Sequence, residues 1–434
     1  MTIDGQFDDW PAGTVALADA HHLYLRVSVD RPMNLQSGAR SVVIRLDLDD
    51  DSTTGGLWSD SAKGPRLGCE LQVQFAAPPE RLGVAVTAID AQGVRRPLSH
   101  AAIGLIHAPT YAATSFELRI ARYPAESSPQ VGIDLASSRT IAGATTLLDG
   151  ADTLATIAFR VALPPGLRPV RADVGLPGRQ AGAVRVVSYN VRNAAPLKHP
   201  QPFGRILSTL GPDIVLIQEW RNASRRQLHE WLDRHLGPTP AWHLSTVSKR
   251  GQVIAARHAV DPIATADACH LAAAVVRTPI GPLAVACVHL SCCGSLDSPQ
   301  ERQRLEQAAA INRVVAAMDP VMSILGGDVN LVGSRRPLAL LGQGLDAGGA
   351  DLAVAPTLVL GQPVQYTWRN PAQVFSPGRL DYLTYSGATL GLQRAFVLDT
   401  EHLSDAALAR SGLEAGDTSF SDHLPLIMDV VRRR

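Results

Sequence analysis

Polar and ionisable residues recur in the second half of the sequence at the points where apolar runs end. Asn190 closes Val-Val-Ser-Tyr-Asn, and Glu219 closes Ile-Val-Leu-Ile-Gln-Glu. His289 closes another apolar run, and Asp328 and Asn330 follow in Gly-Gly-Asp-Val-Asn. A carboxylate or an imidazole at the end of a buried strand costs free energy unless a partner satisfies it. The repetition therefore predicts that these strand ends converge on one site.

Two later segments extend the set, because Asp381 follows Arg379-Leu380 and the pair Asp422-His423 lies in Ser-Asp-His-Leu-Pro. Taken singly, each segment is also typical of an ordinary protein. Glu219 fits a surface residue after a strand, Asn190 a turn, and His289 a hydrogen-bonded core histidine. Gly-Asp-X-Asn fits a tight turn, and Ser-Asp fits a helix cap. The ordered set of all six segments is what favours a shared chemical function.

That ordered set resembles the endonuclease/exonuclease/phosphatase superfamily. The group includes DNase I-like nucleases, exonuclease III-like abasic-site endonucleases, neutral sphingomyelinases and inositol polyphosphate 5-phosphatases. The resemblance covers residues 184–434. It implies a four-layer α/β sandwich with its site at one edge of two paired sheets. It also implies hydrolysis of phosphate esters with Mg²⁺ or Mn²⁺, ions that prefer oxygen ligands and that offset phosphate charge.

The resemblance, together with the chemistry of each side chain, assigns a role to every residue of the set. Glu219 is the expected metal ligand, Asn190 supplies an amide oxygen beside it, and Asp422 completes the metal environment. Asp328 orients or deprotonates the attacking water, and Asn330 holds a phosphoryl oxygen.

The two histidines are expected to donate to non-bridging oxygens on opposite sides of the phosphorus. Asp381 resembles the family carboxylate that orients His423 and keeps it protonated. Two features point away from the abasic-site branch. Arg192 stands where that branch has an acidic residue, and His289 stands where it has a tyrosine. Arg335 is a candidate for binding substrate phosphate. Trp368 fits either substrate stacking or the core.

Residues 1–163 are predicted to form an antiparallel β-sandwich. Apolar and polar residues alternate in short runs around residues 23–29, 42–48, 71–75, 116–120, 131–135 and 157–161. Such alternation is typical of strands with one buried and one wet face. Ile3-Asp4-Gly5, Asp8-Asp9-Trp10 and the acidic run of residues 47–51 resemble family 9-like carbohydrate-binding modules. That acidic run before Gly55-Gly56 fits a Ca²⁺ site, or alternatively a solvated acidic hairpin.

Residues 164–183 are rich in proline and glycine and are predicted to be a linker. After residue 184 the pattern alternates between strands and helices, which is typical of a layered α/β domain. Helices are expected near residues 203–210, 228–232 and 300–317. Buried strands are expected at 184–187, 214–217, 283–289 and 321–326.

Composition argues against several classes of protein. The chain has 434 residues, 46% of them hydrophobic, and a formal net charge of +0, which does not favour non-specific DNA binding. No apolar run approaches the length of about 18 residues that a membrane span needs. Five cysteines do not suggest a disulfide framework. Cys69, Cys269 and Cys287 fit core positions, whereas Cys292-Cys293 fits either a structural or a redox or metal role.

The sequence leaves the substrate and the compartment open. The phosphate ester is a nucleic acid, a phospholipid or a small molecule, and the first domain is expected to bind carbohydrate or to brace the enzyme. The alternative function is a non-catalytic binding protein with a degenerate phosphoesterase domain, although no catalytic residue of the set is missing. The start of the chain does not look like a secretion signal. The protein is thus expected to be cytoplasmic, or secreted or periplasmic if a signal was removed.

Overall fold

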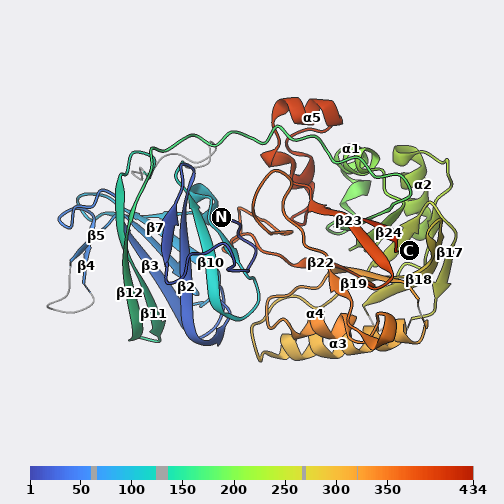
Figure 1. Cartoon of the computed structure of the whole chain (residues 1–434), viewed down its shortest axis with the longest axis horizontal. Helices are drawn as coiled ribbons and strands as arrows, with labels where there is room; N and C mark the ends of the chain where they lie inside the picture. Colours follow the sequence, from blue (N-terminus) through green and yellow to red (C-terminus); the bar gives the residue numbers. More distant parts are fainter. Residues whose placement is uncertain (60–65, 124–134, 266–269, 320, 434) are drawn as a thin grey trace. The chain divides into compact units, whose positions relative to one another are not determined.

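The computed structural model describes residues 1–59, 66–123, 135–265, 270–319 and 321–433, and it divides into two compact units (Figure 1). The first comprises Met1–Val170 with Arg369–Gly378, and the second comprises Arg171–Trp368 with Arg379–Arg434. Residues 369–378 thus belong to the first unit although the second unit flanks them in sequence. Most of the predicted strand at 131–135, and also Cys269, lie outside the described residues.

The first unit consists of antiparallel sheets. The strand orders are β1-β2-β10-β9, β12-β11-β3-β6-β7-β8 and the short pair β4-β5. The strands are β1 (Ala16–Ala18), β2 (His22–Met33), β3 (Arg40–Asp47), β4 (Gly56–Trp58), β5 (Leu67–Cys69), β6 (Leu71–Phe75), β7 (Val84–Ile89), β8 (Arg95–Leu98), β9 (Ile106–Ala108), β10 (Ala113–Ala121), β11 (Thr140–Asp149) and β12 (Asp152–Ala162).

One hydrophobic core joins the two larger sheets of the first unit. It includes Leu25 of β2 and Phe116 of β10 from one sheet, and Ile44 of β3 and Val73 of β6 from the other. Within each of these strands the core residues lie two positions apart, as Leu23, Leu25 and Val27 do in β2. Each strand therefore turns one apolar side toward the core. The unit is therefore mostly β, as the alternating pattern predicted. Strand β12 differs, because it lies at a sheet edge and leaves Ile157 41% exposed.

The second unit contains two mixed six-stranded sheets. Their orders are β15-β16-β14-β13-β24-β23 and β17-β18-β19-β20-β22-β21. The strands are β13 (Val184–Asn190), β14 (Ile214–Gln218), β15 (His243–Leu244), β16 (Val253–Ala256), β17 (Val260–Ile263), β18 (Leu271–Thr278), β19 (Gly281–His289), β20 (Ser323–Asp328), β21 (Ala353–Val354), β22 (Asp381–Tyr385), β23 (Leu390–Val397) and β24 (Leu426–Arg432).

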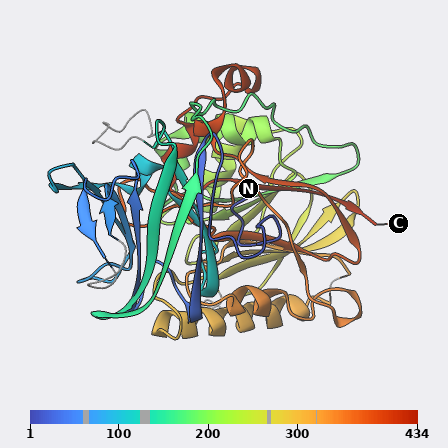
Figure 2. The same cartoon turned by 60° about the vertical axis from the view of Figure 1, so that its left-hand side comes forward.

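Helices cover the outer faces of these sheets (Figures 1 and 2). They are α1 (Pro200–Leu210), α2 (Arg225–Leu236), α3 (Pro299–Ala316), α4 (Arg336–Gly342) and α5 (Asp405–Ser411). Phe203 of α1 and Leu232 of α2 share a buried cluster with Val215 of β14. In Figure 1, α3 and α4 lie beside the other sheet, near β19 and β22. No described helix is long and apolar enough to span a membrane.

The central strands of the two sheets pack face to face, since β13 and β14 contact β20 and β14 contacts β19. Gly326 shows how closely they approach. A Cβ atom there would lie 2.3 Å from Leu383 of the neighbouring strand and 3.1 Å from Leu216 of the opposite sheet. Strands β13, β14 and β20 are buried at every position, as the continuous apolar runs predicted.

Candidate active site

Parallel pairing brings two pairs of predicted residues to matching strand ends. Strands β13 and β14 are parallel, with Asn190 opposite Gln218, and Glu219 follows directly. Strands β19 and β20 are also parallel, with His289 opposite Asp328. Asp328 in turn lies opposite Asp381 across the antiparallel pair β20–β22. Because the two sheets pack face to face, these ends meet at one edge of the second unit.

Glu219 sits in a constrained backbone conformation that holds its carboxylate in the site. Its φ of 62° lies in the left-handed region. This conformation is unfavourable for any residue that has a Cβ atom, and it persists only where contacts with the surrounding residues stabilise it. The Glu219 carbonyl accepts a hydrogen bond from the Ala194 amide at 2.8 Å. Its carboxylate accepts from the Asn193 amide at 3.1 Å and from Asn190 Nδ2 at 3.4 Å. The acid is therefore positioned from both main chain and side chain.

One oxygen of Asp328 is the meeting point of the site. Asn190 Nδ2 donates to Asp328 Oδ2 at 3.2 Å. The Nε2 atoms of His289 and His423 lie 3.4 and 3.5 Å from the same oxygen. The other oxygen, Oδ1, accepts from the Asn330 amide at 3.0 Å. Burial raises the pKa of Asp328 to about 7, with Asp381 adding to the rise and His423 opposing it.

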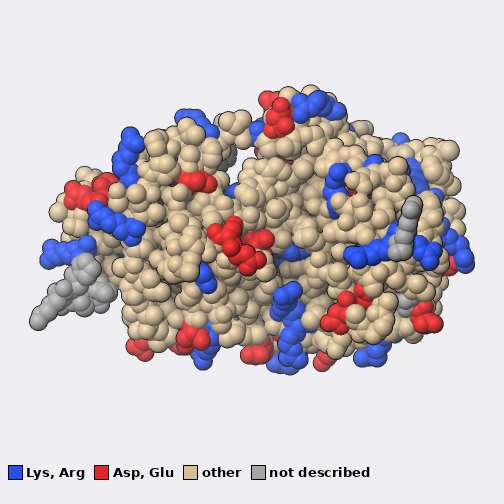
Figure 3. All heavy atoms as spheres, in the orientation of Figure 1, with Lys and Arg blue, Asp and Glu red and all other residues tan. Residues whose placement is uncertain are grey.

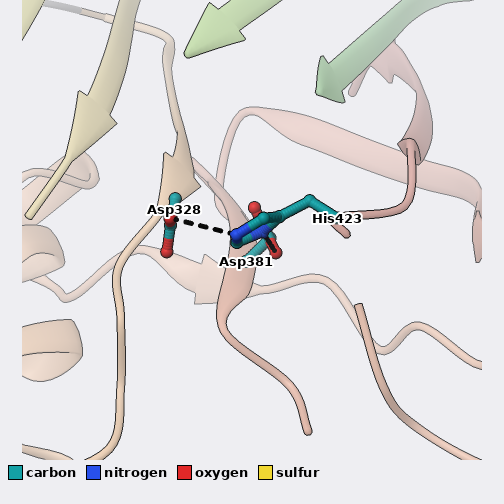
Figure 4. Close-up of side chains that lie close together, drawn as sticks. All are labelled: Asp328, Asp381 and His423. Atoms are coloured by element: carbon teal, nitrogen blue, oxygen red, sulfur yellow. Dashed lines mark hydrogen bonds and ion pairs between the residues drawn. The ribbon is translucent and has the colours of Figure 1, made fainter. Parts of the chain in front are cut away.

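His423 is held between two carboxylates (Figure 4). Its Nδ1 lies 2.8 Å from Asp381 Oδ2, and Thr367 Oγ1 donates to that same oxygen at 2.7 Å. Burial alone would lower the pKa of His423, but Asp381 and Asp328 raise it to about 10. The imidazole is therefore protonated at neutral pH. Asp328, Asp381 and His423 each offer one possible ligand atom within 4.8 Å of the others, but a proton on each imidazole nitrogen favours hydrogen bonding over metal coordination.

His289 is the electrostatic opposite of His423. Burial, together with the nearby Arg221 guanidinium, lowers the pKa of His289 to about 3. Its Nε2 lies 4.0 Å from Glu219 Oε1, and its buried Nδ1 has no hydrogen-bond partner among the residues that the structure describes. A neutral imidazole still carries one N–H and can donate it to an anion without adding positive charge.

The remaining predicted residues divide into those that join the site and one that does not. Asn330 Nδ2 donates to the Leu290 carbonyl at 3.0 Å, which ties it to the loop after His289. Trp368 Nε1 donates to Asp422 Oδ2 at 3.3 Å, and its backbone bridges to that of His423. Arg335 is exposed next to α4, and no described hydrogen bond or ion pair joins it to the others.

Two hydroxyl residues, Ser421 and Thr367, position the site although the sequence predicted no role for them. Ser421 Oγ donates to the Asn190 carbonyl at 2.8 Å and accepts from the His423 amide at 3.2 Å. Thr367 Oγ1 accepts from the Asp381 amide at 2.9 Å in addition to donating to the Asp381 carboxylate. Ser421 lies inside the Ser-Asp-His motif and Thr367 directly precedes Trp368, and this proximity is the sequence signal that could have identified them.

Helix α3 supports two loops, the one that follows His289 and the one that contains Asn330. Arg304 is fully buried and donates to the carbonyls of Ser291 at 3.0 Å and Cys293 at 2.6 Å. It also pairs with Glu301 at 2.9 Å, which accepts from the Ser334 amide at 2.9 Å. A single buried ion pair thus ties together the segments that leave β19 and β20. Cys292 and Cys293, in the first segment, are exposed free thiols with their Sγ atoms 2.6 Å apart.

The oxygen groups on the open side of the site fit a divalent cation. The Glu219 and Asp422 side chains are 18% and 25% exposed, whereas those of Asp328 and Asp381 are each 2% exposed. Mg²⁺ prefers carboxylate and amide oxygens and keeps several water ligands, so it needs partly open groups. Glu219 and Asp422 satisfy that requirement, whereas Asn190 is buried beside them and its amide oxygen accepts from the Arg192 amide at 3.0 Å. Arg221 and Arg192 approach the two acids at 3.8 and 3.9 Å.

Comparison with solved structures gives matches that cover a little more than half of this chain. Beta toxin from Staphylococcus aureus is 14% identical, with a TM-score of 0.38, covering 56% of this chain and 99% of that chain. A 3' phosphatase from Neisseria bound to a product DNA hairpin is 20% identical, with a TM-score of 0.41, covering 57% and 98%. TDP2 from D. rerio, complexed with a single-strand DNA product, is 18% identical, with a TM-score of 0.39, covering 57% and 98%.

A comparison with curated proteins found no match. The sequence model of the endonuclease/exonuclease/phosphatase family matches residues 187–423, which is more than half of the chain. The matched range does not include residues 1–170 of the first unit, whose resemblance to carbohydrate-binding modules stays a prediction. It does include every residue assigned above to catalysis and metal binding. The chain belongs to the endonuclease/exonuclease/phosphatase family, whose members are metal-dependent phosphoric ester hydrolases.

Proposed function

We propose that the second unit hydrolyses phosphodiesters by attack of a water molecule that Asp328 orients and deprotonates. The observation that carries this proposal is the convergence of Asn190, His289 and His423 on Asp328 Oδ2, at 3.2, 3.4 and 3.5 Å. A carboxylate with a pKa of about 7 is ionised in part at neutral pH and is basic enough to accept a proton. A water molecule bound to Asp328 Oδ2 would therefore lie beside the base and beside the imidazoles of His289 and His423.

The two histidines are proposed to bind the phosphoryl oxygens in different ways. His423, kept protonated by Asp381, supplies a charge-assisted hydrogen bond to an oxygen that gains negative charge in the transition state. His289, kept neutral by burial and Arg221, supplies an uncharged N–H. Asn330 is proposed to hold a further phosphoryl oxygen.

A divalent cation, Mg²⁺ or Mn²⁺, is proposed to be held by Glu219, Asn190 and Asp422. When bound, it offsets the charge of the phosphate oxygens. Other contacts within the chain position the three proposed ligands. Ser421 fixes the Asn190 backbone, Trp368 fixes the Asp422 side chain, and the left-handed backbone of Glu219 orients its carboxylate.

The charges around the site favour a diester over a monoester. Glu219, Asp328, Asp381 and Asp422 place four carboxylates at the site, and the adjacent arginines already lie beside two of them. A diester carries a single negative charge at neutral pH, which His423 and the proposed cation offset more completely than the larger charge of a monoester. A nucleic acid, a phospholipid and a small molecule all offer such a bond. Arg335 remains a proposed contact to a more distant phosphate.

A substrate panel tests the proposed reaction class. The purified full-length chain would be assayed with bis(p-nitrophenyl) phosphate and p-nitrophenyl phosphate, and then with plasmid DNA, RNA, sphingomyelin and nucleotides, each with Mg²⁺ and with EDTA. We expect a higher kcat/KM for the diester than for the monoester, and no turnover in EDTA. A preference for monoesters would contradict the diester assignment. Absence of turnover across the whole panel would instead favour the binding-protein alternative.

A further inference from the structure

Three acidic side chains converge at one end of β3 in the first unit. Asp47 is the last residue of β3, Asp49 lies two residues further along, and Glu70 lies between β5 and β6. The pairing of Leu46 with Leu71 brings Glu70 beside Asp47. Each of the three acids offers one carboxylate oxygen, and these oxygens all lie within 4.8 Å of one another. Like charges at this separation repel one another.

The surrounding loop folds around these oxygens. Glu70 Oε2 accepts from the Leu48 amide at 2.8 Å, and Asp49 Oδ1 accepts from the Asp51 amide at 3.0 Å. Thr54 Oγ1 lies 3.0 Å from both Glu70 Oε1 and Asp49 Oδ2. A Cβ atom at Gly55 would lie 2.3 Å from Glu70 Oε1, so glycine allows the loop to pass over that carboxylate.

The Asp47 carboxylate is buried, and hydrogen bonds satisfy only part of it. The side chain of Asp47 belongs to a residue that is 3% exposed, and its Oδ1 has no hydrogen-bond partner in the described part of the chain. Among described residues, no Lys, Arg or His nitrogen forms an ion pair with Asp47, Asp49 or Glu70. The adjacent Asp50 is different, because it pairs with Arg160. Burial and the nearby Glu70 raise the pKa of Asp47 to about 6, which still leaves it largely ionised at neutral pH.

We propose that Asp47, Asp49 and Glu70 bind a divalent cation of the Ca²⁺ type, at a site separate from the active site. The donors are all oxygens, and Ca²⁺ accepts irregular sets of carboxylate, hydroxyl and carbonyl oxygens. A soft metal would need a thiolate or an imidazole. Cys69, which precedes Glu70 in the sequence, instead donates its thiol to the Leu71 carbonyl at 3.5 Å. The run of acids alone did not reveal Glu70, which reaches the cluster through strand pairing.

Calcium titration of the full-length chain tests this site directly. The background is Glu219→Gln, which removes the proposed ligand of the catalytic cation, and the metal-free protein is titrated with CaCl₂ by calorimetry. We expect one site in this background, lost on adding Glu70→Gln or Asp49→Asn. It should be retained on adding Asp90→Asn, a matched control in the turn after β7, where Asp90 accepts from the amides of Gln92 and Val94.

Thermal unfolding supplies a second readout that a purely structural role would not reproduce. In EDTA, Glu70→Gln should raise Tm because it removes repulsion from Asp47. In Ca²⁺, the chain with Glu70 intact should gain Tm and the Glu70→Gln variant should not. Asp49→Asn, at an exposed side chain, repeats the comparison with little risk to folding. The proposal is overturned if the Glu219→Gln background binds no Ca²⁺, or if binding survives both Glu70→Gln and Asp49→Asn.

Discussion

The Asp381→Asn substitution isolates the electrostatic role of the carboxylate beside His423. Asp381 Oδ2 lies 2.8 Å from His423 Nδ1, and the pKa of His423 is raised to about 10. Asparagine keeps the shape of the side chain but removes its charge. An adjacent opposite charge typically shifts a pKa by about 1–3 units, and each unit corresponds to about 1.4 kcal/mol. We therefore expect the pKa of His423 to fall by about 1–3 units in this variant.

The sign of the pH effect follows from the protonated form being the active one. In the wild type His423 keeps its proton until the pH approaches about 10. The alkaline limb of kcat/KM should therefore move to lower pH in Asp381→Asn. The same raised pKa stabilises the folded chain below the ordinary value of about 6.5, and this stabilisation is lost as the pH rises toward about 10.

The pKa itself is measured by NMR on metal-free protein with ¹³C-labelled histidine rings. Asp261→Asn serves as the control, because that exposed carboxylate pairs with the exposed Arg277 between strands β17 and β18. Thr367→Val removes a hydrogen bond to Asp381 while leaving its charge, so the shift should be smaller. An unchanged pKa of His423 in a folded Asp381→Asn variant would refute the reasoning, as would an equal shift in Asp261→Asn.

Three further substitutions test separate parts of the account. Arg304→Met removes the only cation that pairs with buried Glu301 in the described part of the chain. It should lower the free energy of unfolding by about 3–5 kcal/mol, measured in urea; a loss below about 1 kcal/mol would argue against the buried ion pair. Gly326→Ala should cost about 1–3 kcal/mol in the same assay, because its Cβ meets Leu383 at 2.3 Å; a neutral result would contradict the close packing. Glu219→Gln should raise the Mg²⁺ concentration for half-maximal activity by about 10-fold or more, and an unchanged Mg²⁺ titration would exclude it as a ligand.

The strand-end residues could be predicted because their geometry follows from sequence order. An apolar run that ends in a polar residue fixes both the strand and its last position, and parallel pairing then aligns His289 with Asp328. Nothing comparable fixes where an exposed side chain on a loop will lie, and Arg335 is such a case. Strand β12 shows that alternation does not fix the degree of burial, because Phe159 and Val161 pack partly buried against the core while Ile157 of this edge strand is 41% exposed.

Supporting contacts between distant segments were largely beyond the sequence. Trp368 and Asp422 are 54 residues apart, and their contact depends on how two loops cross at the site. Glu70 joins Asp47 only because β3 pairs with β6. The sequence around Arg304 is typical of an exposed helix position, but in the structure this side chain is completely buried. Such contacts are set by tertiary packing, which local patterns do not encode.

The central claim is that Asp328, assisted by His423 and a divalent cation, activates water at a phosphodiester. The most direct measurement compares hydrolysis of bis(p-nitrophenyl) phosphate by the wild type, Asp328→Ala and His423→Ala, with Mg²⁺ and with EDTA. We expect EDTA to abolish wild-type activity and Mg²⁺ to restore it, and each variant to lose about 100-fold or more of kcat even with Mg²⁺. Full activity in a folded, purified Asp328→Ala variant, or in EDTA, would contradict the account.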